Sequence, residues 1–551
     1  MFTGSRLGKS EWDPMARYEH LSREEMIRLL EARDRRDATR FGLVWEANEV
    51  ERERALNRDF VALDLQPELC VGPGPWENLI IEGDNFDALR ALRLAYAGRV
   101  QCIYIDPPYN TGNRDFVYND RFVDREDLWR HSTWVEFMYQ RLTLARDLLA
   151  PGGAIFVSID DNEVFALGML MHKVFGEGAH VATCIWQKRY SRENRGAIGD
   201  AHEYLLVYAP QPELFKQRRG RIPLTAKQLA VYKNPNDDAR GPWQSVSLTA
   251  QGYRPNQMYE IVAPNGNQHR PPEGTCWKVV EAEYRKLVAA DRIYFGKDGN
   301  GVPRRMHFLT GADGLVPWTW WPHEEVGHTD EARKEIQTIF GTQTAFDTPK
   351  PVRLIERVLH IAAPGPDDLV LDFFAGSGTT AHAVLNLNAA DGGRRRFILV
   401  SSTEATADQP EKNLCRDVCA TRVRKVIEGY GETPGLGGDF AYLRCRRLPA
   451  GALIDIEHAE AWMALQLLHR GRIEPWRTAP FLWAGDEQDG LLYVPRFRRE
   501  DLPALREQVR QSAAVVLYSW QPGVLRQLIP DTHVQHEAVP ESLARHFRLG
   551  T

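Results

Sequence analysis

From about residue 76 onwards, short apolar runs alternate with longer segments of helix length. The runs of strand length are 79–81, 101–105, 154–158, 369–373 and 397–400. The segments predicted as helices are 87–96, 134–149, 352–362 and 380–387. Short apolar runs that alternate with helices form a sheet of mostly parallel strands, covered by the helices. The pattern therefore predicts an α/β protein.

Three segments lie outside this alternation. Residues 1–70 are charged and helical in pattern, with capping-box spacing at 22–25. Residues 211–325 are rich in Pro, Gly, Asn, Trp and Tyr, which indicates loops and short strands inserted between two halves of the sheet. Residues 438–551 carry a small α/β pattern of their own. At 551 residues the chain is too long for one domain, and its predicted units are 1–70, 71–210, 211–325, 326–437 and 438–551.

Composition and cysteine usage exclude several classes of protein. With 43% hydrophobic and 26% charged residues, the chain has the composition of a globular protein. No run approaches the roughly 18 apolar residues of a membrane helix, and residues 1–6 lack the apolar stretch of a signal peptide. We therefore expect a soluble, cytoplasmic protein with no membrane partner. The seven cysteines include no CxxC pair, so we expect neither a disulfide framework nor a metal site and interpret Cys415 and Cys419 as thiols on one helix face.

The charge distribution is uneven, although the formal net charge of −6 does not indicate a nucleic-acid binder. Between residues 187 and 240 there are eleven Lys and Arg against six Asp and Glu, a local net charge of +5. A phosphate-binding surface needs only such a local basic stripe. Taken alone, the stripe is equally well explained as solvated surface.

The tetrapeptide Asp106-Pro107-Pro108-Tyr109 directly follows the apolar run that ends at Ile105. A residue before proline is pushed out of the helical region, so Asp106 is expected to be extended at a strand end. A carboxylate and a carbonyl together accept both hydrogens of an aromatic amine, which aims the nitrogen lone pair at an electrophilic methyl group. Tyr109 offers a face on which a flipped-out base stacks, worth about 1–3 kcal/mol. The tetrapeptide alone also fits an ordinary Pro-Pro turn.

A second motif, at 371–380, combines a strand end, a turn of small residues and a helix start. Gly376 and Gly378 allow backbone N–H groups to approach a ligand at the positive end of the helix. The spacing also fits the dinucleotide fingerprint, so this motif alone leaves NAD and S-adenosylmethionine open. The amine clamp at Asp106 favours S-adenosylmethionine. Because ligands lie where strand order reverses, we expect the strands that end at Asp106 and Asp372 to be neighbours.

Together these motifs resemble the β-class amino-methyltransferases of bacterial restriction–modification systems, in which the tetrapeptide precedes a recognition region and then the glycine motif. The fuller resemblance, over about 76–405, is to the modification (Mod) subunits of type III systems. It is carried by 82–89, 104–112, 202–208, 319–322, 348–351 and the glycine motif. The resemblance implies a Rossmann-like methyltransferase fold, with a catalytic half at 71–210, a target-recognition insert at 211–325 and a cofactor-binding half at 326–437.

The resemblance also implies residue roles. Asp106, Pro107, Pro108 and Tyr109 would be catalytic, and the cofactor would be S-adenosylmethionine, released as S-adenosylhomocysteine, with no metal. Its methionine part would lie on the glycine motif, its amino-acid end near Lys350 and its ribose near Glu404. For Asp84, implied near the adenine end, and for Glu404, a solvated loop acid is the alternative. The implied cofactor-binding residues are Asp84, Lys350, Pro351, Asp372, Phe374, Gly376, Ser377, Gly378, Thr379 and Glu404.

The insert, with the basic stripe at its leading edge, is the expected DNA-reading region. Phosphate contacts give affinity without sequence information. The residues expected to make them are Lys188, Arg189, Arg192 and Arg195. Four tryptophans of this region are interpreted as core more readily than as stacking residues, and these are Trp243, Trp318, Trp320 and Trp321.

The leading hypothesis is a site-specific methyltransferase that acts by base flipping on adenine N6 in double-stranded DNA, in a restriction–modification or phage-defence system. An aspartate at position 106 favours adenine N6 by family habit. Cytosine N4 is the alternative target, and RNA is a weaker alternative substrate. A rival hypothesis is a recognition subunit that delivers a helicase–nuclease partner to DNA. The arm at 1–70 and the family favour a homodimer, and the accessory domain at 438–551 has no assigned role.

Overall fold

The structure is a computed structural model. The chain forms two compact units, 1–58 and 59–551. The structure describes Ser22, Arg23, Met26, Ile27 and residues 59–549 except 113–116, 119–120, 123–129, 193–196, 312–313, 343–345, 407 and 450–454. Most of the predicted helical arm at 1–70 therefore lies outside the described residues. All the elements named below belong to the second unit.

A ten-stranded mixed sheet forms the centre of the second unit. Its strands, in spatial order, are β1 (Phe60–Leu65), β21 (Ala441–Leu448), β2 (Leu79–Glu82), β18 (Arg396–Ser401), β17 (Leu369–Asp372), β3 (Val100–Ile105), β6 (Leu149–Ile159), β8 (His202–Tyr208), β7 (His180–Gln187) and β16 (Trp320–Trp321). The run from β21 to β6 is parallel throughout. The predicted α/β class with a mostly parallel sheet is confirmed.

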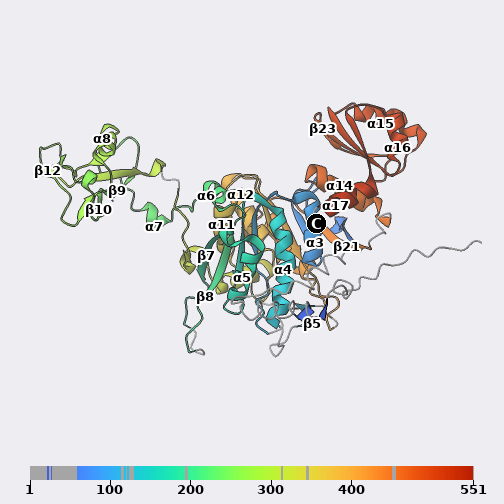
Figure 1. The fold of residues 1–551 in the computed structure, drawn as a ribbon, viewed down its shortest axis with the longest axis horizontal. Helices are drawn as coiled ribbons and strands as arrows, with labels where there is room; N and C mark the ends of the chain where they lie inside the picture. Colours follow the sequence, from blue (N-terminus) through green and yellow to red (C-terminus); the bar gives the residue numbers. More distant parts are fainter. Residues whose placement is uncertain are drawn as a thin grey trace, which may run out of the picture. The chain divides into compact units, whose positions relative to one another are not determined.

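Helices cover both faces of this sheet (Figure 1). One face is covered by α3 (Asn85–Tyr96), α4 (Arg130–Leu148) and α5 (Val164–Phe175). The other is covered by α11 (Val352–Ala362), α12 (Thr379–Asp391), a π-helix at Cys415–Ala420 and α13 (Thr421–Glu428). Further helices nearby are α6 (Pro212–Arg218), α9 (His323–Val326) and α10 (Thr329–Phe340). The result is a three-layer α/β/α sandwich.

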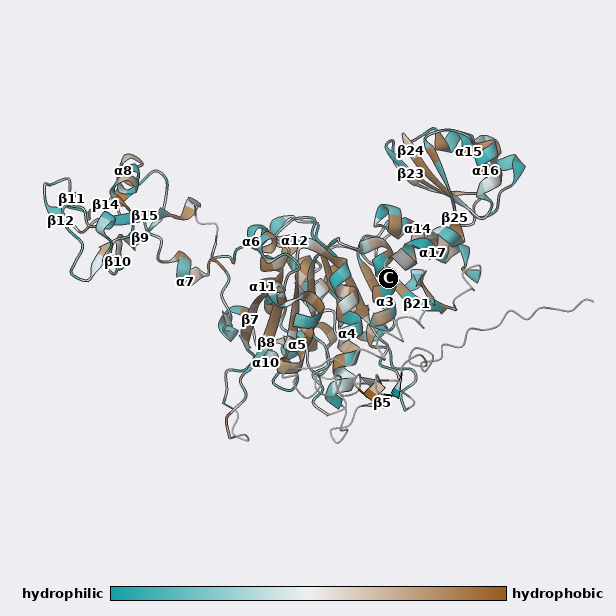
Figure 2. Ribbon diagram, viewed as in Figure 1, coloured by the Kyte–Doolittle hydropathy of each residue, from teal (hydrophilic) through white to brown (hydrophobic). Residues whose placement is uncertain are grey.

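Alternation along the strands decides which side chain enters which core. In β3, Ile103 and Ile105 pack towards α3 and α4, while Cys102 and Tyr104 pack towards α11 and α12. Because both faces are covered, both sets of side chains are buried and the strand reads as a continuous apolar run. Figure 2 shows the central strands as predominantly hydrophobic. Cys415 and Cys419 are buried in the core on the side of α11 and α12.

The large sheet extends beyond the boundaries predicted for its two halves. Strand β1 lies before residue 71 and strand β21 after residue 437, yet they pair with each other, and β21 also pairs with β2. Strand β6 begins at Leu149, before the predicted run at 154–158, and its register with β3 shifts between Val100 and Cys102. The predicted unit boundaries themselves remain predictions.

The region predicted as an insert contains short strands in three small sheets. Strand β9 (Trp243–Ser247) pairs with β15 (Arg304–Phe308), and β15 pairs with β14 (Ile293–Tyr294). Strand β10 (Thr249–Gln251) pairs with β13 (Thr275–Trp277), and β11 (Ile261–Val262) pairs with β12 (Gln268–His269). Helices α7 (Ala226–Leu229) and α8 (Glu281–Ala289) also belong to this region, as does α6. This confirms the predicted loops and short strands.

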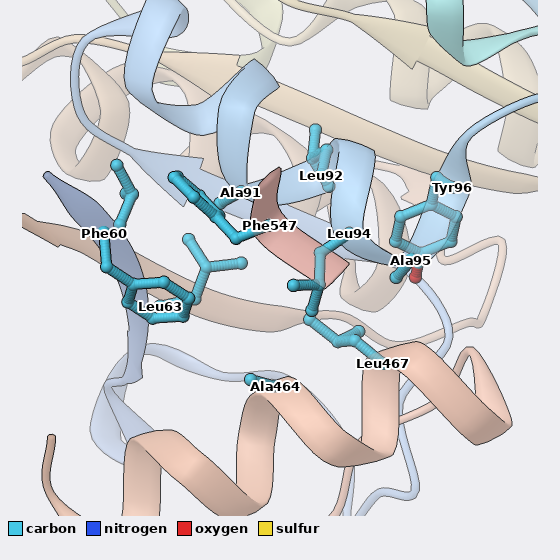
Figure 3. A pocket seen from close by; sticks show the side chains of 11 residues that line it. Phe60, Leu63, Ala91, Leu92, Leu94, Ala95, Tyr96, Ala464, Leu467 and Phe547 are labelled. Atoms are coloured by element: carbon cyan, nitrogen blue, oxygen red, sulfur yellow. The ribbon is translucent and has the colours of Figure 1, made fainter. Parts of the chain in front are cut away.

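The C-terminal segment has a four-stranded sheet of its own. In spatial order its strands are β22 (Leu482–Gly485), β23 (Asp489–Val494), β24 (Ala514–Ser519) and β25 (Val534–Ala538), with the last three parallel. Its helices are α14 (His458–Arg470), α15 (Leu502–Val509), α16 (Pro522–Leu528) and α17 (Val539–Leu549). Apolar side chains of α14 and α17 meet those of β1 and α3 around a small cavity of about 20 Å³ (Figure 3). The segment is thus packed onto the large sheet through apolar contacts.

Among the described residues, the structure contains no helix that is both long enough and apolar enough to span a membrane.

The irregular start of β6 generates a testable prediction about stability. A Cβ atom on Gly153 would lie 2.7 Å from the carbonyl oxygen of Val100 and 2.9 Å from that of Gln101. We expect Gly153→Ala to force β3 and β6 apart and to lower the free energy of unfolding by roughly 1–3 kcal/mol, the usual cost of overpacking. The control is Gly152→Ala, whose Cβ would meet only the flexible side chains of Arg218 and Leu214. Equal denaturant midpoints for the two variants would contradict this reading.

Candidate functional site

The candidate site lies where strands β3 and β17 run side by side. The two strands are parallel neighbours, with Cys102 opposite Val370 and Ile103 opposite Leu371. The sheet continues from β3 to β6 on one side and from β17 to β18 on the other, so strand order reverses between them. Ligands of open α/β sheets bind at the carboxyl ends of strands at such a point. The expectation that the strands ending at Asp106 and Asp372 are neighbours is confirmed.

The Asp106 carboxylate, at the end of β3, is held by two donors. The Tyr109 hydroxyl donates to its Oδ1 at 2.8 Å, and the Lys350 ammonium donates to its Oδ2 at 2.6 Å. The Lys350 nitrogen also lies 5.0 Å from the centre of the Tyr109 ring. Burial raises the pKa of Asp106, although Lys350 opposes this shift. The structure thus brings together the predicted catalytic tetrapeptide and a lysine predicted at the cofactor's amino-acid end.

A second carboxylate, Glu203 on β8, was missed as a site residue. The Tyr109 hydroxyl donates to its Oε2 at 2.9 Å, and Lys350 lies 3.6 Å from the same oxygen. The ammonium of Lys188 lies 3.5 Å from the other oxygen, Oε1. Glu203 belongs to the segment 202–208 that carries the family resemblance. The sequence pattern does not indicate that its side chain lies close to Asp106.

The outer side of the tetrapeptide turn is fixed by α4 and the start of α5. The indole N–H of Trp134 donates to the carbonyl oxygen of Pro108 at 2.7 Å. Asn110, which is fully buried and has a φ of 58°, donates to Oε1 of Glu163 at 2.6 Å and to the carbonyl of Arg130 at 3.2 Å. Because Trp134 binds the Pro108 carbonyl, the turn is anchored and that oxygen is already engaged.

Asp372, at the end of β17, shapes the glycine loop from within. Its Oδ1 accepts the backbone N–H of Phe374 at 3.0 Å, and its Oδ2 accepts the hydroxyl of Thr380 at 2.5 Å. Only 3% of its surface is exposed, and burial raises its pKa to about 7. Asp372 therefore binds both ends of the glycine loop. Its carboxylate oxygens point into the protein.

The glycine loop leads into the positive end of α12. Gly378 precedes the helix with a φ of 79°, and a Cβ there would lie 3.1 Å from the carbonyl oxygen of Cys419, so only glycine fits. Within the described part of the chain, the backbone N–H groups of Gly376 and Ser377 have no hydrogen-bond acceptor. Phe374, half-buried, lies beside Phe137 of α4 with ring centres 6.0 Å apart. Such free amides beside an aromatic face fit a polar ligand with an anionic end.

A buried arginine on α13 was also missed. The Arg422 guanidinium is fully buried and donates to the hydroxyls of Ser377 at 3.1 Å and Thr379 at 2.8 Å. It also pairs with Glu335 at 2.8 Å. The two loop hydroxyls are thus turned towards Arg422, and the loop offers its backbone to the open side. No sequence signal marks a buried arginine within an apolar helix face.

The remaining predicted cofactor residues lie on flanking loops. Asp84 caps α3 by accepting the N–H of Phe86 and forms an ion pair of 2.9 Å with Arg141. Its neighbour Asn85 donates to the carbonyl of Phe373 at 2.9 Å, which ties this loop to the glycine motif. Pro351 is buried as the N-cap of α11. Glu404 is exposed and forms an ion pair of 2.9 Å with Lys412.

The predicted phosphate contacts do not share one environment. Lys188 is largely buried and pairs with Asp200 at 2.8 Å as well as with Glu203. Arg189 and Arg192 are exposed, whereas Arg195 lies outside the described residues.

The four tryptophans of this region also lie in different environments, since two belong to cores and two are exposed. Trp243 and Trp321 are buried, and Trp318 and Trp320 are 57% and 45% exposed.

Comparisons with known proteins agree with this geometry. Over 364 residues the chain is 40% identical to the type III restriction-modification enzyme StyLTI Mod subunit of Salmonella typhimurium, covering 60% of this chain and 53% of that protein. It is 33% identical to the EcoPI Mod subunit of Escherichia phage P1, covering 60% and 58%. The chain therefore matches between half and three fifths of the length of these relatives.

Solved structures are similar at a lower level. The PvuII cytosine-N4-specific DNA methyltransferase is 12% identical, with coverage of 66% of this chain and 96% of that one and a TM-score of 0.33. The M1.HpyAVI protein in complex with SAM is 14% identical, with coverage of 59% and 92% and a TM-score of 0.27. These scores are too low to carry a functional argument.

The family model described as DNA methylase matches residues 100–408, which is more than half of the chain. The matched range begins at β3, contains the tetrapeptide and the insert, and ends just after the glycine motif and the β18 strand. The chain therefore belongs to the DNA methylase family.

Proposed function

We propose that this chain is an S-adenosylmethionine-dependent methyltransferase that acts on adenine N6 in double-stranded DNA. The observation that supports it most is the parallel pairing of β3 with β17, since it sets an amine-accepting carboxylate and a glycine loop at one edge of the sheet. Reactants held side by side need no covalent intermediate for an in-line transfer. A flipped-out base brings its exocyclic amine to this edge.

The clamp on the amine consists of Asp106 and a carbonyl of the tetrapeptide. Trp134 already binds the Pro108 carbonyl, so Pro107 is our candidate for the second acceptor. The Tyr109 hydroxyl is bound to two carboxylates, which holds its ring in one orientation as a stacking face. An exocyclic amine that donates to two acceptors keeps its lone pair directed away from both, towards the methyl donor.

The residues around the glycine loop fit S-adenosylmethionine, which as a substrate would supply an electrophilic methyl group. The free N–H groups of Gly376 and Ser377 and the buried ammonium of Lys350 suit the charged amino-acid end of that molecule. In the structure Lys350 binds Asp106, so this role requires the ammonium to turn from one carboxylate to another. Asp84 and Glu404 are proposed for the adenine and ribose ends.

The choice of base and of partners rests on the named relatives. Two Mod subunits of type III restriction-modification enzymes are 40% and 33% identical to this chain, which favours adenine and a restriction–modification role. Cytosine N4 remains the second candidate, because the clamp accepts any exocyclic amine of a base. We propose a homodimer and a helicase–nuclease partner on the same ground, the similarity to Mod subunits. Arg189 and Arg192 are the exposed candidates for phosphate contacts.

The function is tested by incubating the chain with labelled S-adenosylmethionine and duplex DNA of mixed sequence, followed by digestion to nucleosides. We expect the label in N6-methyladenine. Label in N4-methylcytosine would show that cytosine N4, and not adenine N6, is the target. Absence of label from all bases, over varied substrates, would reject the function.

Asp106→Ala removes one acceptor of the amine clamp. We expect the methyl-transfer rate to fall by at least about 100-fold, the size of one positioned acid or base, while the Kd for S-adenosylhomocysteine changes little. The control is Asp367→Ala, an exposed acid close to the opposite end of β17. Single-turnover kinetics and calorimetry measure the two quantities. Activity that survives in Asp106→Ala would reject the clamp.

Arg422→Lys keeps a positive charge below the glycine loop but loses the planar fork that binds Ser377 and Thr379 together. Charge-assisted hydrogen bonds are worth about 1.5–3 kcal/mol, so we expect the Kd for S-adenosylhomocysteine to rise by roughly tenfold or more. Arg416→Lys, at an exposed arginine paired with Asp417, is the matched control. An unchanged Kd in Arg422→Lys would show that the loop keeps its shape without this arginine.

A further inference from the structure

The site holds two carboxylates that share the same two donors. Asp106 ends β3 and Glu203 lies on β8, and the Tyr109 hydroxyl is 2.8 Å from the first and 2.9 Å from the second. The Lys350 ammonium is 2.6 Å from Asp106 and 3.6 Å from Glu203. Both donors are buried or half-buried, so these distances describe one compact cluster at the centre of the site.

A count of hydrogens shows what this arrangement is suited to. A phenol carries one hydrogen, yet the Tyr109 oxygen lies at hydrogen-bond distance from an oxygen of each carboxylate. When Tyr109 donates to one of them, a full hydrogen bond to the other requires that the other carboxyl group carry a proton. The cluster therefore gains a hydrogen bond when it takes up one proton. Burial raises the pKa of Asp106 most, Lys350 lowers it, and the charge of Glu203 raises it again.

The surroundings of the cluster differ at its two ends. Around Asp106 lie Tyr104 and Asp372, both buried; burial raises the pKa of Tyr104, and the charges of Asp106 and Asp372 add to this shift. Around Glu203 lie Lys188 and Asp160, and Lys188 leads on to Asp200 at 2.8 Å. The Asp200 carboxylate is nearly half exposed. The Glu203 end therefore connects to the surface through charged groups, whereas the Asp106 end is the one a bound base would cover.

We propose that Asp106 and Glu203, bridged by the Tyr109 hydroxyl, act as one proton-holding pair that takes up the proton lost by the target amine. This inference rests on the proposed function. Glu203 is a positioning residue, because it acts on the amine only through Tyr109 and Asp106.

Methyl transfer moves one proton from the target amine to the pair. The amine nitrogen forms a bond to the methyl carbon, the carbon–sulfur bond breaks, and its electron pair stays on sulfur, which becomes a neutral thioether. The positive charge passes to the nitrogen, and one N–H proton moves to Asp106. A shift of the phenolic hydrogen from Tyr109 to Glu203, with replacement from Asp106, spreads this proton over the pair. It returns to water when the product leaves.

The experiment measures the single-turnover rate of methyl transfer against pH, where the acidic limb reports the ionisation of Asp106. Glu203→Gln removes a like charge, so we expect the limb to move to lower pH by about one unit. Tyr109→Phe keeps the stacking ring but removes a donor to Asp106, so its limb moves to higher pH by a similar amount. The control is Glu213→Gln, at an exposed glutamate of α6, which leaves the limb in place.

Opposite shifts in the two variants support the pair. Equal losses of rate at every pH, without movement of either limb, would mean that Glu203 only supports the structure and would overturn the inference. If Glu203→Gln does not fold, the pH profile of Tyr109→Phe is the remaining test. An acidic limb that does not move in Tyr109→Phe would overturn the proposed pair. A wild type that methylates no base overturns the proposed function itself, which separates the two failures.

Discussion

The parallel pairing of β3 with β17 is the constraint on which the rest of the site depends. It aligns the carboxyl ends of the two strands, so that the turn after Ile105 and the loop after Asp372 open at the same edge. Both strands are buried on both faces, which leaves no freedom for one to slide against the other without moving a whole row of side chains. Residues 106 and 372, far apart along the chain, are thereby held together by the core.

Each of the two loops is then fixed from the side that faces the protein. Trp134 and Asn110 hold the tetrapeptide turn, and Asp372 and Arg422 hold the glycine loop. Burying the charged groups of Asp372 and Arg422 is costly unless they are hydrogen-bonded, and Asp372 accepts from Phe374 and Thr380 while Arg422 donates to Ser377, Thr379 and Glu335. The consequence is a site whose open side presents Asp106, the face of Tyr109 and backbone amides. Such preorganised groups are what a transfer by proximity and orientation requires.

Much of the fold could be predicted because the strands are apolar runs and the two motifs fall at strand ends. The helix at 352–362 was predicted with its observed bounds, and the neighbouring strands followed from a general rule for α/β sheets. Glu203 and Arg422 could not be found, since their roles come from pairing across distant strands and helices, which no local pattern encodes. Lys350 was singled out, but its contact with Asp106 was not foreseen for the same reason. The strand at 441–448 joins the large sheet because it pairs with β2, a contact between segments over 300 residues apart.

We propose that the β3 and β17 edge holds the target amine and the methyl donor together. This is tested most directly by an experimental structure of the chain with S-adenosylhomocysteine and duplex DNA that contains the methylated site. We expect a flipped-out base whose exocyclic nitrogen lies within hydrogen-bond distance of Asp106, with the sulfur of the ligand between that nitrogen and the loop at 374–378. A ligand bound elsewhere on the sheet, or an amine held by residues other than Asp106, would contradict it.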